Sequence, residues 1–144
     1  MAGKIHLDLV TPERLLISEE VDEVIASGSE GEFGVLPGHC DFLTTLRIGE
    51  LRYRKGDEWR SLSVSWGYAE VGPKRITVLA ELAERAEEID LARAEAAIQK
   101  AEEQLAQPHV PSDELERIRQ RLAKAHLRKR VAEKHRDGGS SISH

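Results

Sequence analysis

The spacing of hydrophobic and polar positions in this chain changes near residue 80. Before this point apolar residues alternate with polar ones, beginning with Ile5, Leu7 and Leu9, and a period of two is typical of a half-buried β-strand. Further short apolar runs, separated by turn signals, fall at residues 15–17, 21–26, 51–54, 59–66, 68–71 and 76–78. The pattern predicts a β-domain over residues 1–85, an antiparallel β-sandwich or barrel.

Two of these runs indicate which side chains face the core. Val24 and Ala26 fall on one face of their strand, and in the run 59–66 the shared face carries Leu62, Val64 and Trp66. Because side chains alternate along a strand, we expect each of these sets to be buried together.

After residue 80 the spacing becomes helical. Strong helix formers dominate, and no glycine occurs until Gly138. Apolar residues recur at spacings of three and four, at Leu91, Ala94, Ile98, Ala101, Leu105, Leu115, Ile118, Leu122 and Ala125. This spacing predicts helices at about 90–106 and 113–135, separated by the break at 107–111 and packed as an antiparallel hairpin within residues 86–136.

The end of the second helix is predicted to be weakly held. Leu127 and Val131 lie off the line that the other apolar positions follow, and an alanine-rich contact buries little area. We therefore expect this end to detach most easily. Residues 137–144 have nothing to bury and are predicted to be a disordered tail.

Composition limits the classes of function. The chain of 144 residues is 33% charged and only 4% aromatic, and no apolar run approaches the length of about 20 residues that spans a bilayer. We expect no direct membrane insertion. The six histidines are scattered, and none forms a cluster with Cys40 or carboxylates at metal-ligand spacing. The sequence therefore predicts no metal site, and it contains no nucleophile elbow that would indicate a catalytic residue.

The charges are divided unequally. Residues 1–88 hold 10 basic and 17 acidic side chains, whereas residues 111–144 hold 9 basic and 5 acidic ones. A basic segment on an acidic body suggests that this segment either folds back or meets an acidic partner.

The stretch from Gly28 to Gly49 combines turn-forming glycines and proline with a group of apolar residues. Four glycines and a proline fall between Gly28 and Gly38, followed by Phe42, Leu43, Leu46 and Ile48. Glycine permits positive φ and proline fixes φ, so this stretch predicts a shaped loop that leads into a strand. Such a loop is either an ordinary connection between strands or a binding site.

The sequence resembles the epsilon subunits of bacterial-type F-type ATP synthases. The resemblance is carried by GSEGEFGVLPGHCDFL at residues 28–43, which contains GxxGxLPGH at 31–39, and by the IDxxRA motif at 89–94. A β-domain of about 85 residues followed by a two-helix hairpin has the same order, and the match covers the chain up to its tail.

The resemblance implies a non-catalytic rotor subunit of the central stalk. Such a subunit couples proton translocation through the membrane ring to ATP synthesis in the catalytic head, at the cytoplasmic face of the bacterial inner membrane. One face of the sandwich would hold the gamma subunit, and Glu32 and His39 of the loop would contact the ring of c subunits. The alternative is that Glu32 is only a solvent-exposed residue of a turn and that His39 only stabilises this turn.

The resemblance also implies a regulatory role for the hairpin. Extended, its second helix would meet acidic segments of the beta and alpha subunits of the head and restrain ATP hydrolysis. The candidate contacts are the cations Arg117, Arg121, Lys124, Arg128, Lys129 and Arg130. The alternative is a solvated basic face balanced by Glu114 and Glu116, since exposed ion pairs contribute only about 0–1 kcal/mol.

The IDxxRA motif allows two interpretations. The resemblance implies that Asp90 and Arg93 bind a regulatory ATP, while no cofactor is required for function. The sequence departs from the motif at Lys100, where an arginine would strengthen it. A carboxylate can accept from the adenine amino group, and a guanidinium can pair with phosphate. Alternatively, Asp90 caps the first helix and pairs with Arg93 one turn later.

Another class of function stays open at this point. A stand-alone interaction module could use the basic helix to dock an acidic protein or nucleic acid, and a free nucleotide sensor is a weaker alternative. The low aromatic content argues against a stacking platform for bases, so we expect no nucleic-acid partner.

Overall fold

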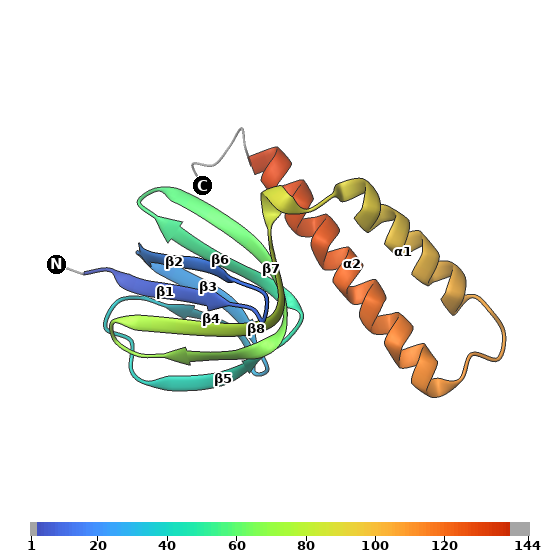
Figure 1. Ribbon diagram of the computed structural model, residues 1–144, viewed down its shortest axis with the longest axis horizontal. Coiled ribbons are helices and arrows are strands. Elements are labelled where there is room, and N and C mark those ends of the chain that lie inside the picture. Colours follow the sequence, from blue (N-terminus) through green and yellow to red (C-terminus); the bar gives the residue numbers. More distant parts are fainter. Residues whose placement is uncertain (1–2, 139–144) are drawn as a thin grey trace.

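Eight strands precede two long helices in the computed structural model, which describes residues 3–138 (Figure 1). The strands are β1 (Ile5–Val10), β2 (Leu15–Val21), β3 (Glu23–Gly28), β4 (Gly31–Val35), β5 (Phe42–Leu46), β6 (Gly49–Lys55), β7 (Glu58–Val71) and β8 (Arg75–Arg85). A short 3-10 helix, η1 (Ala86–Glu88), leads into α1 (Leu91–Leu105) and α2 (Ser112–Gly138). The predicted sandwich followed by a helical hairpin is confirmed.

The strands form a sheet in the order β2-β1-β8-β7-β5-β3-β4, and β6 pairs with both β3 and β7. All pairs are antiparallel except β1 and β8, which run parallel. Because β8 lies between β1 and the long strand β7, it ties the first strand of the domain to its last hairpin.

The core of the sandwich is a single cluster of nineteen buried side chains, nearly all aliphatic. Ile5, Leu7 and Leu9 face it as their alternation predicts, and so do Val24 and Ala26. One large aromatic side chain, Tyr53, is fully buried, and its hydroxyl donates a hydrogen bond to Glu19 at 3.3 Å.

Trp66 departs from the predicted alternation. It was expected to share the buried face of Leu62 and Val64, but it is exposed and has a positive φ of 56°. The next residue, Gly67, passes so close to β8 that a Cβ atom would lie 1.9 Å from the carbonyl oxygen of Leu79. The local distortion of β7 turns the indole outward, and the sequence signals it only through the glycine.

The two helices pack along the predicted seam. Ala94, Ile98, Ala101, Ile118 and Ala125 are all buried. Helix α2 extends to Gly138, three residues beyond its predicted end, and from residue 139 on the predicted tail lies outside the described residues. Within the described part of the chain, no helix is long and apolar enough to cross a membrane.

The end of α2 has a packing partner that the sequence analysis did not foresee. Leu127, Val131 and Ala132 form a second buried cluster with Ala86 of η1 and with Ile89. In Figure 1 this end of α2 lies against the sandwich, while the turn between α1 and α2 projects away from it. Leu127 and Val131 lie off the helix–helix seam because they pack against a different surface, which the spacing alone does not reveal.

Candidate functional site

The predicted loop is shaped by two glycines and tied to the β7–β8 turn at Gly38. Gly31 and Gly38 have positive φ values of 120° and 89°, a conformation that glycine adopts without strain. The Gly38 N–H donates to Pro73 O at 2.8 Å, which ties the loop to the turn between β7 and β8. The loop is therefore shaped by backbone contacts and presents its side chains from a fixed frame.

The structure places Glu32 near the start of β4 and His39 in the turn after its end. Glu32 is exposed, and its carboxylate lies 3.6 Å from Arg52 Nη2. His39 Nδ1 lies 2.7 Å from Cys40 O, a geometry in which the ring donates to that carbonyl. The His39 ring is thus hydrogen-bonded within the loop, and Glu32 is exposed at the surface.

Apolar side chains near the loop divide between the core and the surface. Val35 is buried, and Phe33 packs partly against the core, whereas Leu36 and Phe42 are exposed. Leu43 and Tyr68 are also exposed, at 67% and 47%, and they lie on the paired strands β5 and β7. Sequence reasoning missed Tyr68, because its surface position depends on the distortion at Trp66 and Gly67.

The part of the loop that holds Gly38 and His39 lies at the end of the sandwich away from the hairpin (Figure 1), whereas Glu32 pairs with Ser27, which contacts Gly49 on the hairpin side. Strand β8 starts next to the turn that holds Gly38 and ends at η1, where the hairpin begins. Its eleven residues, at about 3.3 Å each, give a path of roughly 35 Å along the curved strand between the two ends. One molecule can therefore contact different partners at its two ends.

The predicted cations of α2 fall into two groups. Those near the start of the helix, Arg117, Arg121 and Lys124, make no ion pair with the sandwich among the described residues; Arg117 pairs only with Asp113, one turn before it. Those near its end are engaged: Arg128 with Glu84 and Lys129 with Glu95. Lys134, which was not among the candidates, pairs with Glu50. Arg130 lies among the second group but is exposed and has no such pair.

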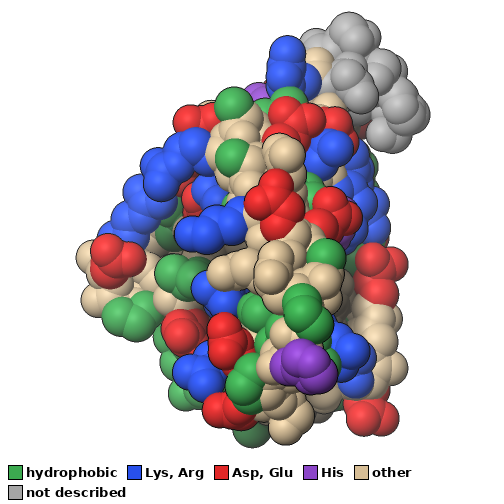
Figure 2. All heavy atoms as spheres, turned by 90° about the vertical axis from the view of Figure 1, so that its right-hand side faces the viewer, with side chains coloured by type: hydrophobic (Ala, Val, Ile, Leu, Met, Phe, Trp, Pro, Cys, Tyr) green, Lys and Arg blue, Asp and Glu red, His purple; other side chains and the backbone are tan. Residues whose placement is uncertain are grey.

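The basic residues do not form a continuous stripe. Figure 2, viewed from the hairpin side, shows Lys and Arg side chains interspersed with Asp and Glu side chains. A shallow surface hollow of about 580 Å³ at the start of α2 is lined by Arg117, Arg121, Lys124 and the acidic residues Asp113 and Glu114. Any acidic partner would meet the cations of α2 as individual contacts.

The IDxxRA motif caps the first helix. Asp90 is the N-cap of α1, and its Oδ1 accepts from the Arg93 backbone N–H at 3.2 Å. The Arg93 side chain is exposed. The cap accounts for Asp90, and the Arg93 guanidinium makes no ion pair within residues 3–138.

A polar cluster lies on the outer face of β1 and β2. His6 Nδ1 is 2.6 Å from Glu20 Oε2, and His6 Nε2 is 3.0 Å from Asp8 Oδ1. The Glu20 hydrogen bond raises the pKa of His6 above 6.5, whereas the Ser18 hydrogen bond lowers the pKa of Asp8. These groups stabilise the pairing of β1 with β2.

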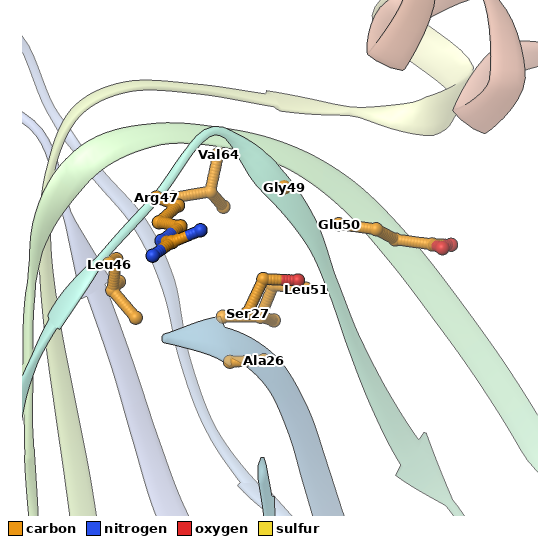
Figure 3. Close-up of a pocket in the computed structure, with 8 residues that line it drawn as sticks. All are labelled: Ala26, Ser27, Leu46, Arg47, Gly49, Glu50, Leu51 and Val64. Atoms are coloured by element: carbon orange, nitrogen blue, oxygen red, sulfur yellow. The ribbon is translucent and has the colours of Figure 1, made fainter. Parts of the chain in front are cut away.

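Enclosed space in the sandwich is small. The cavity in Figure 3, between Ala26, Leu46 and Val64, has a volume of about 10 Å³, room for about one water molecule. Among residues 3–138, no group of three or more His, Cys, Asp or Glu side chains could hold a metal ion.

Two domain models match the chain in the same order as its two structural parts. Residues 4–86 match "ATP synthase, Delta/Epsilon chain, beta-sandwich domain", and residues 87–133 match "ATP synthase, Delta/Epsilon chain, long alpha-helix domain". The chain belongs to the ATP synthase delta/epsilon chain family. The matches meet between residues 86 and 87, within η1.

Bacterial relatives in this family are similar over nearly the whole chain. The ATP synthase epsilon chain of Syntrophobacter fumaroxidans is 52% identical over 93% of this chain and 99% of its own length. That of Geotalea uraniireducens is 51% identical over 93% and 97%. That of Geobacter metallireducens is 59% identical over 71% and 74%. The predicted non-catalytic epsilon subunit of the F-type ATP synthase central stalk is confirmed.

Solved structures share the fold of this family member at lower identity. A chain of the Euglena gracilis mitochondrial ATP synthase (OSCP/F1/c-ring) aligns with a TM-score of 0.77 at 24% identity, over 86% of this chain and 78% of that one. A chain of the Tetrahymena thermophila mitochondrial ATP synthase (central stalk/c-ring) aligns with a TM-score of 0.65 at 13% identity, over 91% and 98%.

Proposed function

We propose that the chain links the proton-conducting ring to the catalytic head and restrains ATP hydrolysis through its hairpin. The observation that carries this proposal is the separation of the turn that holds Gly38 and His39 from the hairpin along β8. The complex would hold the chain at the cytoplasmic face of the bacterial inner membrane, without direct insertion. Because the chain belongs to this family, we no longer consider the alternative of a stand-alone module that binds an acidic protein or nucleic acid.

The sandwich end would bind the gamma subunit and the ring. Leu43 and Tyr68 offer an exposed apolar surface suited to gamma, and Glu32 offers a carboxylate to the polar loops of the c subunits. His39 would act by holding the loop in shape. A pull-down of gamma with the full chain tests this part. Double replacement of Leu43 and Tyr68 by serine should weaken capture, and undiminished capture would contradict the assigned face.

The hairpin end would regulate the head by leaving the sandwich. A small apolar cluster and a few ion pairs hold α2 in the docked position, so it can detach while the sandwich stays folded. In the extended position, cations of α2 would contact acidic segments of the beta and alpha subunits. Arg117, Arg121 and Lys124 carry the first contacts in this proposal, because they are not engaged with the sandwich.

Replacing Arg117, Arg121 and Lys124 together by alanine tests the regulatory role. Each exposed ion pair contributes about 0–1 kcal/mol, so loss of three should lower the extended population by roughly tenfold. ATP hydrolysis by the reassembled complex should rise. A variant with lysine at positions 117 and 121 keeps the charge and should keep the inhibition. Hydrolysis that stays at the wild-type rate in the alanine variant would contradict the proposal.

ATP is the regulatory ligand that we propose for Asp90 and Arg93. The exposed Arg93 guanidinium can pair with phosphate, and the carboxylate of Asp90 has acceptor capacity beyond its cap hydrogen bond. Isothermal titration of the full chain should detect binding at millimolar ATP. Arg93→Ala should abolish it while keeping the backbone N–H that Asp90 caps. Absence of heat with the wild-type chain would contradict ATP binding.

A further inference from the structure

Two carboxylates of the sandwich lie on one row beneath α2. Glu50 of β6 and Glu84 of β8 both pair in register with Ser63 of β7. All three side chains point away from the sandwich core, since their neighbours Leu51, Leu62 and Ala83 face it. Ser63 is nevertheless only 5% exposed, because α2 packs over this part of β7.

Helix α2 brings one cation to each carboxylate. Arg128 donates from Nε to Glu84 Oε1 at 2.7 Å and from Nη2 to Glu84 Oε2 at 3.1 Å. Lys134 Nζ lies 3.0 Å from both carboxylate oxygens of Glu50. In Figure 3 the Glu50 side chain points away from the other residues around the cavity.

The spacing of the cations matches that of the carboxylates. Six residues of α-helix rise about 9 Å, which separates Arg128 from Lys134 along α2. Two inter-strand spacings of about 4.8 Å separate Glu50 from Glu84 across β7. Both pairs can therefore form at the same time without distortion of the helix or of the sheet, and a shift of α2 along its axis would break both.

The ion pairs are partly protected from solvent. The side chains of Arg128 and Glu84 are 29% and 37% exposed, and in the second pair Glu50 is 14% exposed while Lys134 is 48% exposed. The buried cluster around Leu127 and Val131 lies on the same stretch of α2. Charge-assisted bidentate contacts in such a setting are stronger than fully exposed pairs and fix one orientation.

We propose that Glu50 and Glu84 form an anionic docking site that holds α2 down by competing with acidic partners for Arg128 and Lys134. The proposal rests on the proposed function, because competition requires a state in which α2 leaves the sandwich. Arg128 and Lys134 cannot bind the carboxylates of the sandwich and those of an acidic partner at the same time. The negative charge of the docking site therefore sets the balance between the docked and extended positions, and neutralising it favours extension.

Hydrogen exchange of the full chain tests the docking site. In the double variant Glu50→Gln/Glu84→Gln, backbone amides of residues 127–136 should exchange roughly five- to tenfold faster, as expected for the loss of two partly protected pairs. Glu81→Gln is the matched control: Glu81 is exposed on the same strand and has no ion pair among the described residues, so exchange should not change. Exchange at the wild-type rate in the double variant would overturn the proposal.

A charge reversal separates the electrostatic contact from a general effect on packing. Glu84→Arg alone should accelerate exchange of the same amides, and Glu84→Arg combined with Arg128→Glu should restore protection. Failure of the swapped pair to restore protection would also overturn the proposal. Tryptophan fluorescence verifies that the sandwich is folded in each variant, because Trp59 and Trp66 both lie in β7.

Hydrolysis by the reassembled complex separates this proposal from the proposed function. Faster exchange together with lower hydrolysis in the double glutamine variant supports both. Faster exchange with unchanged hydrolysis supports the docking site and contradicts regulation by the hairpin. Unchanged exchange, with relief of inhibition in the Arg117/Arg121/Lys124 alanine variant, contradicts the docking site and leaves the proposed function standing.

Discussion

Buried side chains hold together both the sandwich and the contact of α2 with it, but the two clusters differ greatly in size. The sandwich has nineteen residues in one cluster, held between strands that pair along their lengths. The docked end of α2 has five, supplemented by ion pairs to Glu50 and Glu84. Because hydrophobic stabilisation grows with buried area, the second contact can open while the first stays closed. The difference makes one part a fixed body and the other a movable arm.

The largest effect is expected from a cavity in the sandwich core. Leu62 is 1% exposed in the long central strand β7, and Leu62→Ala should destabilise the fold by about 3 kcal/mol. Urea denaturation followed by tryptophan fluorescence measures the loss. Leu43→Ala removes the same atoms from an exposed position and should stay within about 0.5 kcal/mol of the wild type. Similar losses for both variants would contradict the assignment of this core.

A smaller and separable effect is expected at the docked end of α2. Leu127→Ala should weaken docking by about 2 kcal/mol, because it leaves a cavity between α2 and η1. Amides of residues 127–136 should exchange faster, while the urea midpoint reported by tryptophan fluorescence stays near that of the wild type. If that midpoint fell in parallel, docking and sandwich stability would be coupled, and the contrast between a fixed body and a movable arm would be lost.

The two regions also differ in how far the sequence predicts them. Alternation at Ile5, Leu7 and Leu9 identifies a core face, because strand geometry fixes where each side chain points. Trp66 escapes this reasoning, since the distortion beside Gly67 depends on a close approach to β8 that is distant in sequence. The sequence pattern therefore predicts burial where the strand geometry alone determines the side-chain direction, and fails where a contact distant in sequence changes it.

The sequence pattern does not predict the contact between α2 and the sandwich. The spacing of Leu127 and Val131 shows that they leave the helix–helix seam, but not which surface receives them. The pairing of Arg128 with Glu84 spans 44 residues and depends on the strand register. The sequence identified the cations of α2 as functional candidates and could not separate those bound to the sandwich from those that are free.

A local change in the arm should have a moderate effect. Asp90→Ala removes the acceptor that caps α1 and should cost about 1 kcal/mol of helix stability. Exchange of the first amides of α1, at residues 91–94, should increase, and the sandwich should melt as before. Asp90→Asn keeps an acceptor at this position and should stay within a few tenths of a kcal/mol of the wild type. Equal effects of the two substitutions would show that the charge of Asp90, and not its cap, stabilises the helix.

The smallest effect concerns an edge of the sandwich alone and depends on pH. The hydrogen bond to Glu20 raises the pKa of His6, so protonated His6 stabilises the folded state below pH about 6.5. This stabilisation is lost as pH rises through the pKa of His6 in the folded state. Below pH about 4 a second loss begins, because Asp8, whose pKa is lowered by Ser18, is protonated as pH falls through its folded-state pKa.

His6→Gln isolates the contribution of the imidazole. The difference in melting temperature between the wild-type chain and this variant should be larger at pH about 5.5 than at pH about 8, since only the lower value keeps the ring protonated. An NMR titration of the wild-type imidazole should give a midpoint above 6.5, and Glu20→Gln should lower it, because Glu20 is the main cause of the shift. A midpoint that did not respond to Glu20→Gln would show that the ring titrates independently of β2. At any one pH, the exchange of α2 amides should be the same in the wild type and in His6→Gln, because His6 lies on β1 and makes its hydrogen bonds within β1 and β2.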